Sequence, residues 1–172
     1  MIISTLGSWL PGDPRGWRSR GHKQHSSGDY HQPPPGDEQA GLWRWNERRI
    51  DQPVLLPVAL RRVVGRALVD RLTQDKWQVL TCAVDHKHAH LLVKLPDAPA
   101  TLKRIIGQAK QAASRAVRPD LPGRIWATGG KYKLIADRAH HRRTYRYILH
   151  DQGDGAWAWS FREGVVHDPA WR

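Results

Sequence analysis

The chain has 172 residues, with 28 Lys and Arg against 16 Asp and Glu, a net charge of +12 and a pI near 10.5. This length suits one domain, and the single cysteine, Cys82, excludes an internal disulfide and a cysteine-based zinc cage. So large a positive surplus predicts a polyanionic partner, of which nucleic acid is the commonest.

The N-terminal part of the chain changes composition after a short apolar run. Residues 2–10 (IISTLGSWL) are predicted to form a strand, whereas residues 11–53 are dense in Gly, Pro, Ser and charge and predict a long loop or insertion. Basic and aromatic residues interleave in this insertion: Arg15, Trp17, Arg18, Arg20, Trp43 and Trp45. Such a pattern suits base stacking with phosphate contact. Tryptophans that attach the insertion to the rest of the domain would give the same pattern.

The middle of the chain predicts one helix and two strands. Residues 58–72 have the periodicity of an amphipathic helix, and residues 77–84 and 88–95 read as strands joined by a brief turn near Asp85. The predicted helix has this apolar stripe: Leu60, Val63, Val64, Ala67, Leu68 and Leu72. Because side chains alternate along a strand, the apolar residues of 88–95 share one face and His88 and His90 share the other.

The C-terminal half predicts two further helices. They span residues 100–117 and 138–151, and a strand or hairpin at 125–135, broken at Gly129 and Gly130, lies between them. The resulting order is strand, helix, strand, strand, helix, strand, helix. This order is typical of an α+β, ferredoxin-like split βαβ fold with an antiparallel sheet, helices on one face and an additional C-terminal helix. We therefore expect residues 1–172 to form a single domain with the insertion at about 11–53.

Two histidines on the exposed face of a strand predict a cation site. His88 and His90 stand two positions apart, a spacing at which both imidazoles can converge on one ion, although satisfied or exposed polar residues would also explain the pair. A structural zinc site needs four protein ligands, and the sequence has no second dense cluster of Cys or His outside the insertion. An open site with two His and one carboxylate or amide is therefore the better interpretation.

The last predicted helix adds a candidate nucleophile. Tyr145, Ile148 and Leu149 form its apolar stripe, so Tyr147 lies on the opposite side, with Asp151 one turn further on. A tyrosine turned away from the core is either a plain surface residue or a nucleophile. In the second case its phenol oxygen attacks phosphorus to form a covalent intermediate while a cation polarises the phosphate.

Taken together, these motifs resemble those of a known family. His88-Ala89-His90 is similar to the His-hydrophobic-His motif of the HUH single-strand DNA nucleases, and YILHD at 147–151 resembles the Y-I-x-x-(Asn/Gln/His) box of their single-tyrosine transposases. Within that superfamily the chain is most similar to the REP-associated tyrosine transposases. Some of these also carry boxes like GSWLPGDPRG at 7–16 and GAW at 155–157. The resemblance covers nearly the whole chain in order.

The resemblance implies a ferredoxin-like transposase acting on single-stranded DNA near a hairpin or inverted repeat. Tyr147 would attack the scissile phosphate, leaving a 5′-phosphotyrosyl enzyme and a free 3′-OH, and attack by another 3′-OH would complete strand transfer. His88 and His90 would hold Mg²⁺ or Mn²⁺, with Asp151 as third ligand where the family more often has an amide or His. His150 and Gln152 are the alternatives to Asp151. His86 is extra to the motif and is expected to contact DNA or solvent.

Clustered basic residues are the expected phosphate contacts. Outside the insertion they are Lys103, Arg104, Lys110, Arg138, Arg142, Arg143 and Arg146. Two other functions are compatible with the sequence: a domesticated or inactive relative that binds DNA hairpins without cleavage, and a metal-dependent hydrolase or binding protein in which the tyrosine is incidental. The protein is expected to be cytoplasmic and nucleoid-associated, without a membrane partner, because no apolar run approaches the ~20 residues of a membrane span and no signal peptide is visible. A homodimer is possible.

Overall fold

The computed structural model describes residues 1–17, 25–27, 32, 34–49, 53–153 and 155–171. The chain divides into two compact units, Met1–Thr5 with Leu55–Arg172 and, inserted between them, Leu6–Val54. The inserted unit corresponds closely to the Gly- and Pro-rich segment expected at 11–53. Within the described residues, no helix is both long and apolar enough to cross a membrane.

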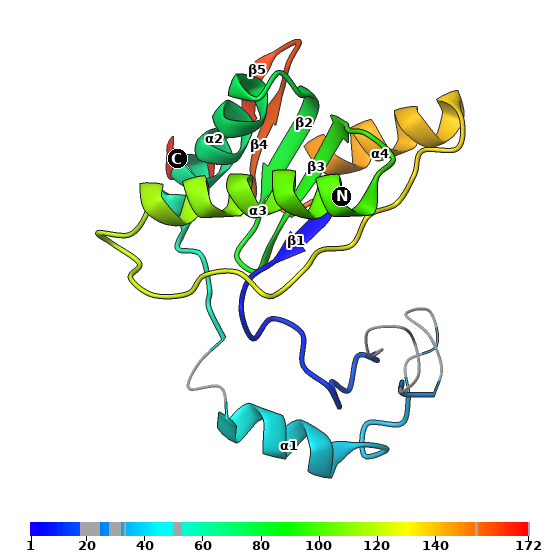
Figure 1. Cartoon of the computed structure of the whole chain (residues 1–172). Coiled ribbons are helices and arrows are strands. Elements are labelled where there is room, and N and C mark those ends of the chain that lie inside the picture. The colour runs from blue at the N-terminus through cyan, green and yellow to red at the C-terminus, as the bar shows by residue number, and fades with distance from the viewer. Residues whose placement is uncertain (18–24, 28–31, 33, 50–52, 154, 172) are drawn as a thin grey trace. The chain divides into compact units, whose positions relative to one another are not determined.

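The elements follow one another in this order (Figure 1): β1 (Ile2–Ser4), α1 (Ala40–Arg49), α2 (Val58–Gln74), β2 (Gln78–Val84), β3 (His88–Lys94), α3 (Pro99–Ala116), α4 (Arg138–His150), β4 (Trp157–Ser160), β5 (Gly164–His167) and the 3₁₀ turn η1 (Pro169–Trp171). The α+β class expected from the sequence is confirmed. The expected bounds of α2, β2, β3, α3 and α4 differ from the observed ones by at most about two residues.

The larger unit is built on a five-stranded sheet in the order β1-β3-β2-β4-β5, in which all the paired strands are antiparallel. Helices α2 and α3 pack against each other on one face, and α4 packs on the other face against β2, β3 and β4 (Figure 1). Because side chains alternate between the two faces along β2 and β3, their apolar residues gather on the first face. Its buried strand residues include Val79, Cys82, Val84, Ala89 and Leu91.

The second face carries its own apolar cluster under α4. Leu92 of β3 and Ala83 of β2 pack with Ile148 and Leu149 of α4. Ile148 and Leu149 belong to the stripe expected from the helical spacing, and Tyr145 packs at the edge of the same cluster. The sequence predicts that the face of the sheet with the histidines is free of helices, but the helix that carries Tyr147 partly covers it.

Three segments differ from the sequence-based expectation. The first strand ends at Ser4 instead of reaching residue 10, because the chain leaves the sheet for the inserted unit. Residues 125–135 form only isolated bridges along β1, Thr5 with Trp126 and Ile2 with Lys131, in place of a regular strand. The tryptophan-rich tail that begins at Gly155, for which the sequence predicts no element, forms β4 and β5 and extends the sheet beyond β2.

The tail joins the sheet because its alternating pattern fits the core. Trp157 is fully buried, and an ideal Cβ on Gly65 of α2 would lie 2.1 Å from the Trp157 ring. Gly65 thus lets helix and strand approach closely. Arg61, one turn earlier on α2, is also buried and donates to the carbonyl oxygens of Leu56, at 3.1 Å, and of Gly155. These contacts fix the start of the tail to α2.

The inserted unit contains helix α1 and a set of local polar contacts. Arg15 pairs with the buried carboxylate of Asp13 and lies over the exposed ring of Trp9, 4.5 Å from the ring centroid. The Trp17 side chain is buried and donates to Gln39. In this unit at least one tryptophan therefore serves packing within the insertion itself, a role different from the two that the sequence suggested.

Candidate functional site

The candidate site forms where β3 meets α4. The His88 and His90 rings lie side by side on β3, with ring centroids 4.6 Å apart and planes at 72°. The exposed ring of Tyr147 meets His90 edge to face, with centroids 5.6 Å apart. The apolar cluster beneath α4 holds this arrangement. Because Ile148 and Leu149 are buried in that cluster, the neighbouring Tyr147 lies on the side of α4 that borders β3.

Burial keeps both histidines ready to act as ligands. Desolvation, with a smaller contribution from the adjacent His88, lowers the pKa of His90 to about 3. Desolvation also lowers the pKa of His88, against the opposing effect of the Asp85 carboxylate. Both imidazoles are therefore neutral near pH 7 and have a free nitrogen lone pair, which is the form that binds metal ions.

Gln152, one of the alternatives to Asp151, lies at the histidine pair. Its side-chain amide donates to the Tyr147 carbonyl at 3.0 Å, and its interaction with the His88 side chain acts to raise the pKa of His88, a smaller effect than the desolvation that lowers it. Asp151 is the C-cap residue of α4 and is exposed. Among the described residues, no group of three or more His, Cys, Asp or Glu side chains is placed to hold a metal ion. The amide of Gln152, which interacts with His88, is thus a candidate third donor beside the carboxylate of Asp151.

This donor set fits one of the two expected cations better than the other. Two neutral imidazoles and one amide oxygen supply two nitrogens and one oxygen. Mg²⁺ prefers oxygen ligands almost exclusively, whereas Mn²⁺ accepts imidazole more readily. The residues present therefore fit Mn²⁺ better than Mg²⁺, with open positions left for phosphate oxygens.

Polar contacts stabilise the turn that precedes β3 and its two histidines. His86 Nδ1 donates to Asp85 at 2.8 Å, and Arg61 lies 3.8 Å from the same carboxylate. Burial acts to raise the pKa of Asp85, but the hydrogen bond from His86 acts against burial, and this pKa lies below its ordinary value. The Asp85 carboxylate is therefore ionised and stabilises the turn, and the His86 side chain is hydrogen-bonded to this carboxylate.

The expected phosphate contacts divide into two groups. Exposed side chains on α3 and α4 are free to meet a polyanion: Lys103, Arg104, Arg138, Arg142, Arg143 and Arg146. Lys110 instead donates to the carbonyl oxygens of Ala127, at 2.9 Å, and Gly129, so it holds the segment after α3. Arg15 pairs with Asp13, and Arg18 and Arg20 lie outside the described residues.

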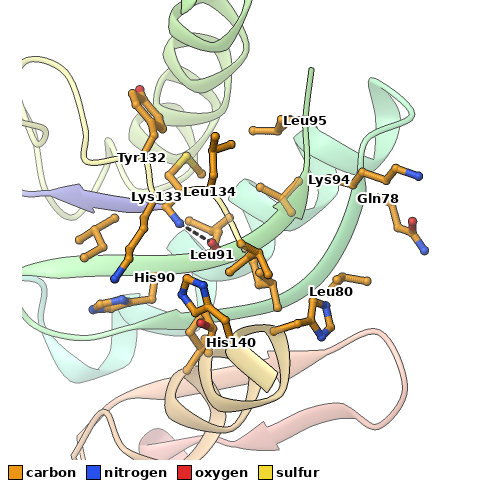
Figure 2. A pocket seen from close by; sticks show the side chains of 18 of the residues that line it. Gln78, Leu80, His90, Leu91, Lys94, Leu95, Tyr132, Lys133, Leu134 and His140 are labelled. Carbon is orange, nitrogen blue, oxygen red and sulfur yellow. Dashed lines mark hydrogen bonds between the residues drawn. The ribbon is translucent and has the colours of Figure 1, made fainter. Parts of the chain in front are cut away.

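A pocket of about 590 Å³ adjoins the site and was not expected from the sequence. Figure 2 shows Tyr132, Lys133 and Leu134 along one side of it and His140 on the opposite side, with His90 between them. Tyr147 also lines it. The only signal for it in the sequence is the run GKYKLI at 130–135, in which basic residues alternate with tyrosine and leucine, a pattern that also predicts a strand.

Comparisons of the chain with protein-family models, with curated proteins and with solved structures return no match. The chemistry must therefore be argued from the site itself. A tyrosine ring in contact with one of two neutral imidazoles, bordered by exposed arginines, is suited to nucleophilic attack on a cation-bound phosphodiester.

Proposed function

We propose that this protein is a metal-dependent single-stranded DNA endonuclease and strand transferase, a transposase that acts through a 5′-phosphotyrosine intermediate. The observation that carries the proposal is the contact between the rings of Tyr147 and His90, which come from elements far apart in the sequence. A tyrosine that is incidental to the histidine pair has no reason to border it.

In the proposed reaction the Tyr147 hydroxyl oxygen forms a bond to phosphorus and gives up its proton. The bond between phosphorus and the 3′ oxygen of the preceding nucleotide breaks, and that oxygen takes up a proton to become a free 3′-OH. The 5′ end of the following strand then remains on Tyr147. Attack by another 3′-OH reverses these steps and joins two strands without ATP.

The residues around Tyr147 have separate tasks in this proposal. His88, His90 and Gln152 would hold Mn²⁺ or Mg²⁺, which polarises the phosphate and stabilises the charge that develops on its oxygens. Gln152 also donates to the Tyr147 carbonyl, a bond within the C-terminal end of α4. This bond stabilises the stretch of chain that follows the nucleophile.

The fold is compatible with the proposed family at a finer level than its α+β class. Residues 126–131 bridge to β1, β1 pairs with β3, and β3 pairs with β2. If the bridged segment is counted as a fourth strand, this order is that of a ferredoxin-like split βαβ fold, with β4 and β5 added beyond β2. We include that assignment in the proposal.

Exposed arginines on α4 support a polyanionic substrate. Arg142, Arg143 and Arg146 lie within about one turn of Tyr147 and are all exposed. A phosphate backbone that follows this helix would pass the nucleophile. The excess of positive charge over the whole chain, +12, favours the same class of partner.

A covalent adduct assay tests the proposal directly. The full-length protein is incubated with Mn²⁺ and single-stranded oligonucleotides taken from the flanks of its gene, each with its hairpin, and resolved on a denaturing gel. We expect a protein–DNA band with 3′-labelled DNA and a shortened product with 5′-labelled DNA, because Tyr147 retains the 5′ phosphate. Tyr147→Phe should abolish both products.

Tyr145→Phe is the matched control. The Tyr145 hydroxyl is buried without a hydrogen-bond partner, so its removal costs little and leaves the surface of α4 unchanged. The proposal fails if no oligonucleotide gives an adduct, or if Tyr147→Phe retains it. Tight hairpin binding without an adduct would indicate instead a binding protein that has lost cleavage.

A further inference from the structure

The pocket beside Tyr147 has a composition that the proposed chemistry does not require. It lies between the second half of β3, residues 132–135 and the first turns of α4, and His90 and Tyr147 line it at the candidate site. Its volume, about 590 Å³, lies within the range of about 300–1,000 Å³ typical of sites that enclose a small molecule. It therefore has room for at least one nucleotide.

The lining combines an apolar surface with an aromatic ring. Leu91, Leu95 and Leu102 line it from β3, the segment that follows β3, and α3. Tyr132 and Leu134, which are 42% and 75% exposed, lie together on one side (Figure 2). Leu134 and Tyr132 together form an exposed apolar patch, and a flat aromatic ligand placed beside them would cover both.

The charges around the pocket are complementary to an anion. Lys94 and Lys133 line it, against one acidic residue, Asp97. His140 adds a directed donor, because its Nδ1 accepts the backbone N–H of Ala136 at 3.2 Å and its Nε2 then carries the ring proton. An aromatic group that carries a phosphate matches this lining better than an uncharged apolar ligand does.

We propose that this pocket receives the base of a nucleotide that flanks the phosphate attacked by Tyr147. The inference rests on the proposed function for its substrate, single-stranded DNA. Tyr132 and Leu134 provide the stacking and apolar contact, Lys133 and His140 bind the adjoining phosphate, and the Thr144 hydroxyl lines the same pocket as a hydrogen-bonding group that can distinguish bases. The pocket thereby places the scissile phosphate at Tyr147 and contributes sequence preference at one position.

Binding measurements isolate this pocket from cleavage. The Tyr147→Phe protein, in EDTA, is titrated by fluorescence anisotropy with the oligonucleotides of the adduct assay, in which a single abasic site is moved along the strand. We expect one position at which loss of the base weakens binding on the order of tenfold, the usual contribution of one stacked base. At other single-stranded positions the effect should be smaller.

A double-mutant comparison identifies Tyr132 as the contact. Tyr132→Ala, made in the same background, should weaken binding to intact DNA by a similar factor, and in that variant the critical abasic site should cost nothing further. Phe161→Ala is the control, because Phe161 is an aromatic side chain exposed to a similar extent, 48%, that does not line the pocket. It should bind intact and abasic DNA as the parent does.

The outcomes separate the two proposals. Equal effects at every abasic position, equal effects of Tyr132→Ala and Phe161→Ala, or no binding to any oligonucleotide would overturn the base pocket. If Tyr147-dependent adducts still form in the first two cases, the proposed function stands without it. Conversely, a critical abasic position that requires Tyr132, found without any adduct, would support the pocket and reject the transesterase. If a free deoxynucleoside monophosphate displaces the oligonucleotide and binds with the same affinity as it, the pocket is a mononucleotide site. That result would also overturn the inference.

Discussion

The ring of Tyr147 meets the ring of His90 edge to face, at 78° between planes, although one comes from helix α4 and the other from strand β3. The contact exists because α4 packs its apolar stripe on the histidine face of the sheet. A nucleophile and a pair of neutral imidazoles are thereby assembled from residues that are not adjacent in the sequence. The predictions below test each part of that assembly.

The histidine pair should be required for chemistry and dispensable for DNA binding. We expect His88→Ala and His90→Ala each to reduce adduct formation by at least about 100-fold, because ligands to a metal contribute no less than their supporting residues do. Removal of divalent ions with EDTA should have the same effect, and added Mn²⁺ should restore the parent protein more efficiently than Mg²⁺. His86→Ala, which removes only the partner of Asp85, should cause a much smaller loss. An equal loss from His86→Ala would argue against a two-histidine site.

The third donor can be identified with two neighbouring substitutions. Gln152→Ala should lower adduct formation and raise the Mn²⁺ concentration needed for half-maximal rate by about 10-fold or more, because the Gln152 amide contacts His88. Asp151→Ala should have less effect, because the exposed Asp151 caps the helix through its backbone. The reverse order of effects would restore Asp151 as the ligand, as the family pattern suggested.

The salt dependence of DNA affinity should distinguish basic side chains that contact DNA from those that stabilise the fold. Arg146→Gln should reduce the slope of log affinity against log salt concentration by about 0.7, the value for one phosphate contact to single-stranded DNA. Lys110→Gln should leave this slope unchanged and lower thermal stability, because the Lys110 ammonium holds two carbonyl oxygens. Anisotropy titrations at several salt concentrations measure the first effect, and thermal unfolding measures the second. A lower slope for Lys110→Gln would show that the ammonium leaves its carbonyl partners to bind DNA.

The close approach of α2 to β4 should make one glycine irreplaceable. Gly65→Ala should destabilise the protein by about 1–3 kcal/mol or more, because its Cβ would overlap the buried Trp157 ring. Gly107→Ala is the control: Gly107 lies in α3 with nothing within 4 Å of the added Cβ. It should stabilise by about 0.5–1 kcal/mol through helix propensity. Chemical denaturation of both variants measures the difference, and equal behaviour would show that Trp157 does not pack on α2.

Arg61 should be structural despite its charge. Its substitution by Met should cost about 2–5 kcal/mol, because the Leu56 and Gly155 carbonyl oxygens would lose the donor that the buried guanidinium provides. The free energy of unfolding in urea measures the loss. Arg66→Met is an exposed control on the same helix and should change stability by less than about 0.5 kcal/mol. Similar values for the two variants would contradict the role given to Arg61.

Local periodicity determined much of the protein. The alternation in 88–94 identified which face of β3 holds His88 and His90, and the helical spacing around Tyr147 identified Ile148 and Leu149 as its buried stripe. These assignments needed only near neighbours, because the repeat of a strand or helix fixes which side chains share a face. The same local reasoning placed Arg61 off the apolar stripe of α2, where the structure buries it.

Only the tertiary structure decided which separate segments come together. It placed Gln152, two residues beyond the end of helix α4 at His150, where it interacts with His88 of β3. It also turned the tryptophan-rich tail into strands β4 and β5 and formed the pocket from β3, α4 and residues 132–135. Such contacts depend on packing between elements distant in the sequence, which no local pattern encodes. The sequence by itself thus determined the candidate chemistry, whereas the packing of α4 on the sheet decided which groups share the site.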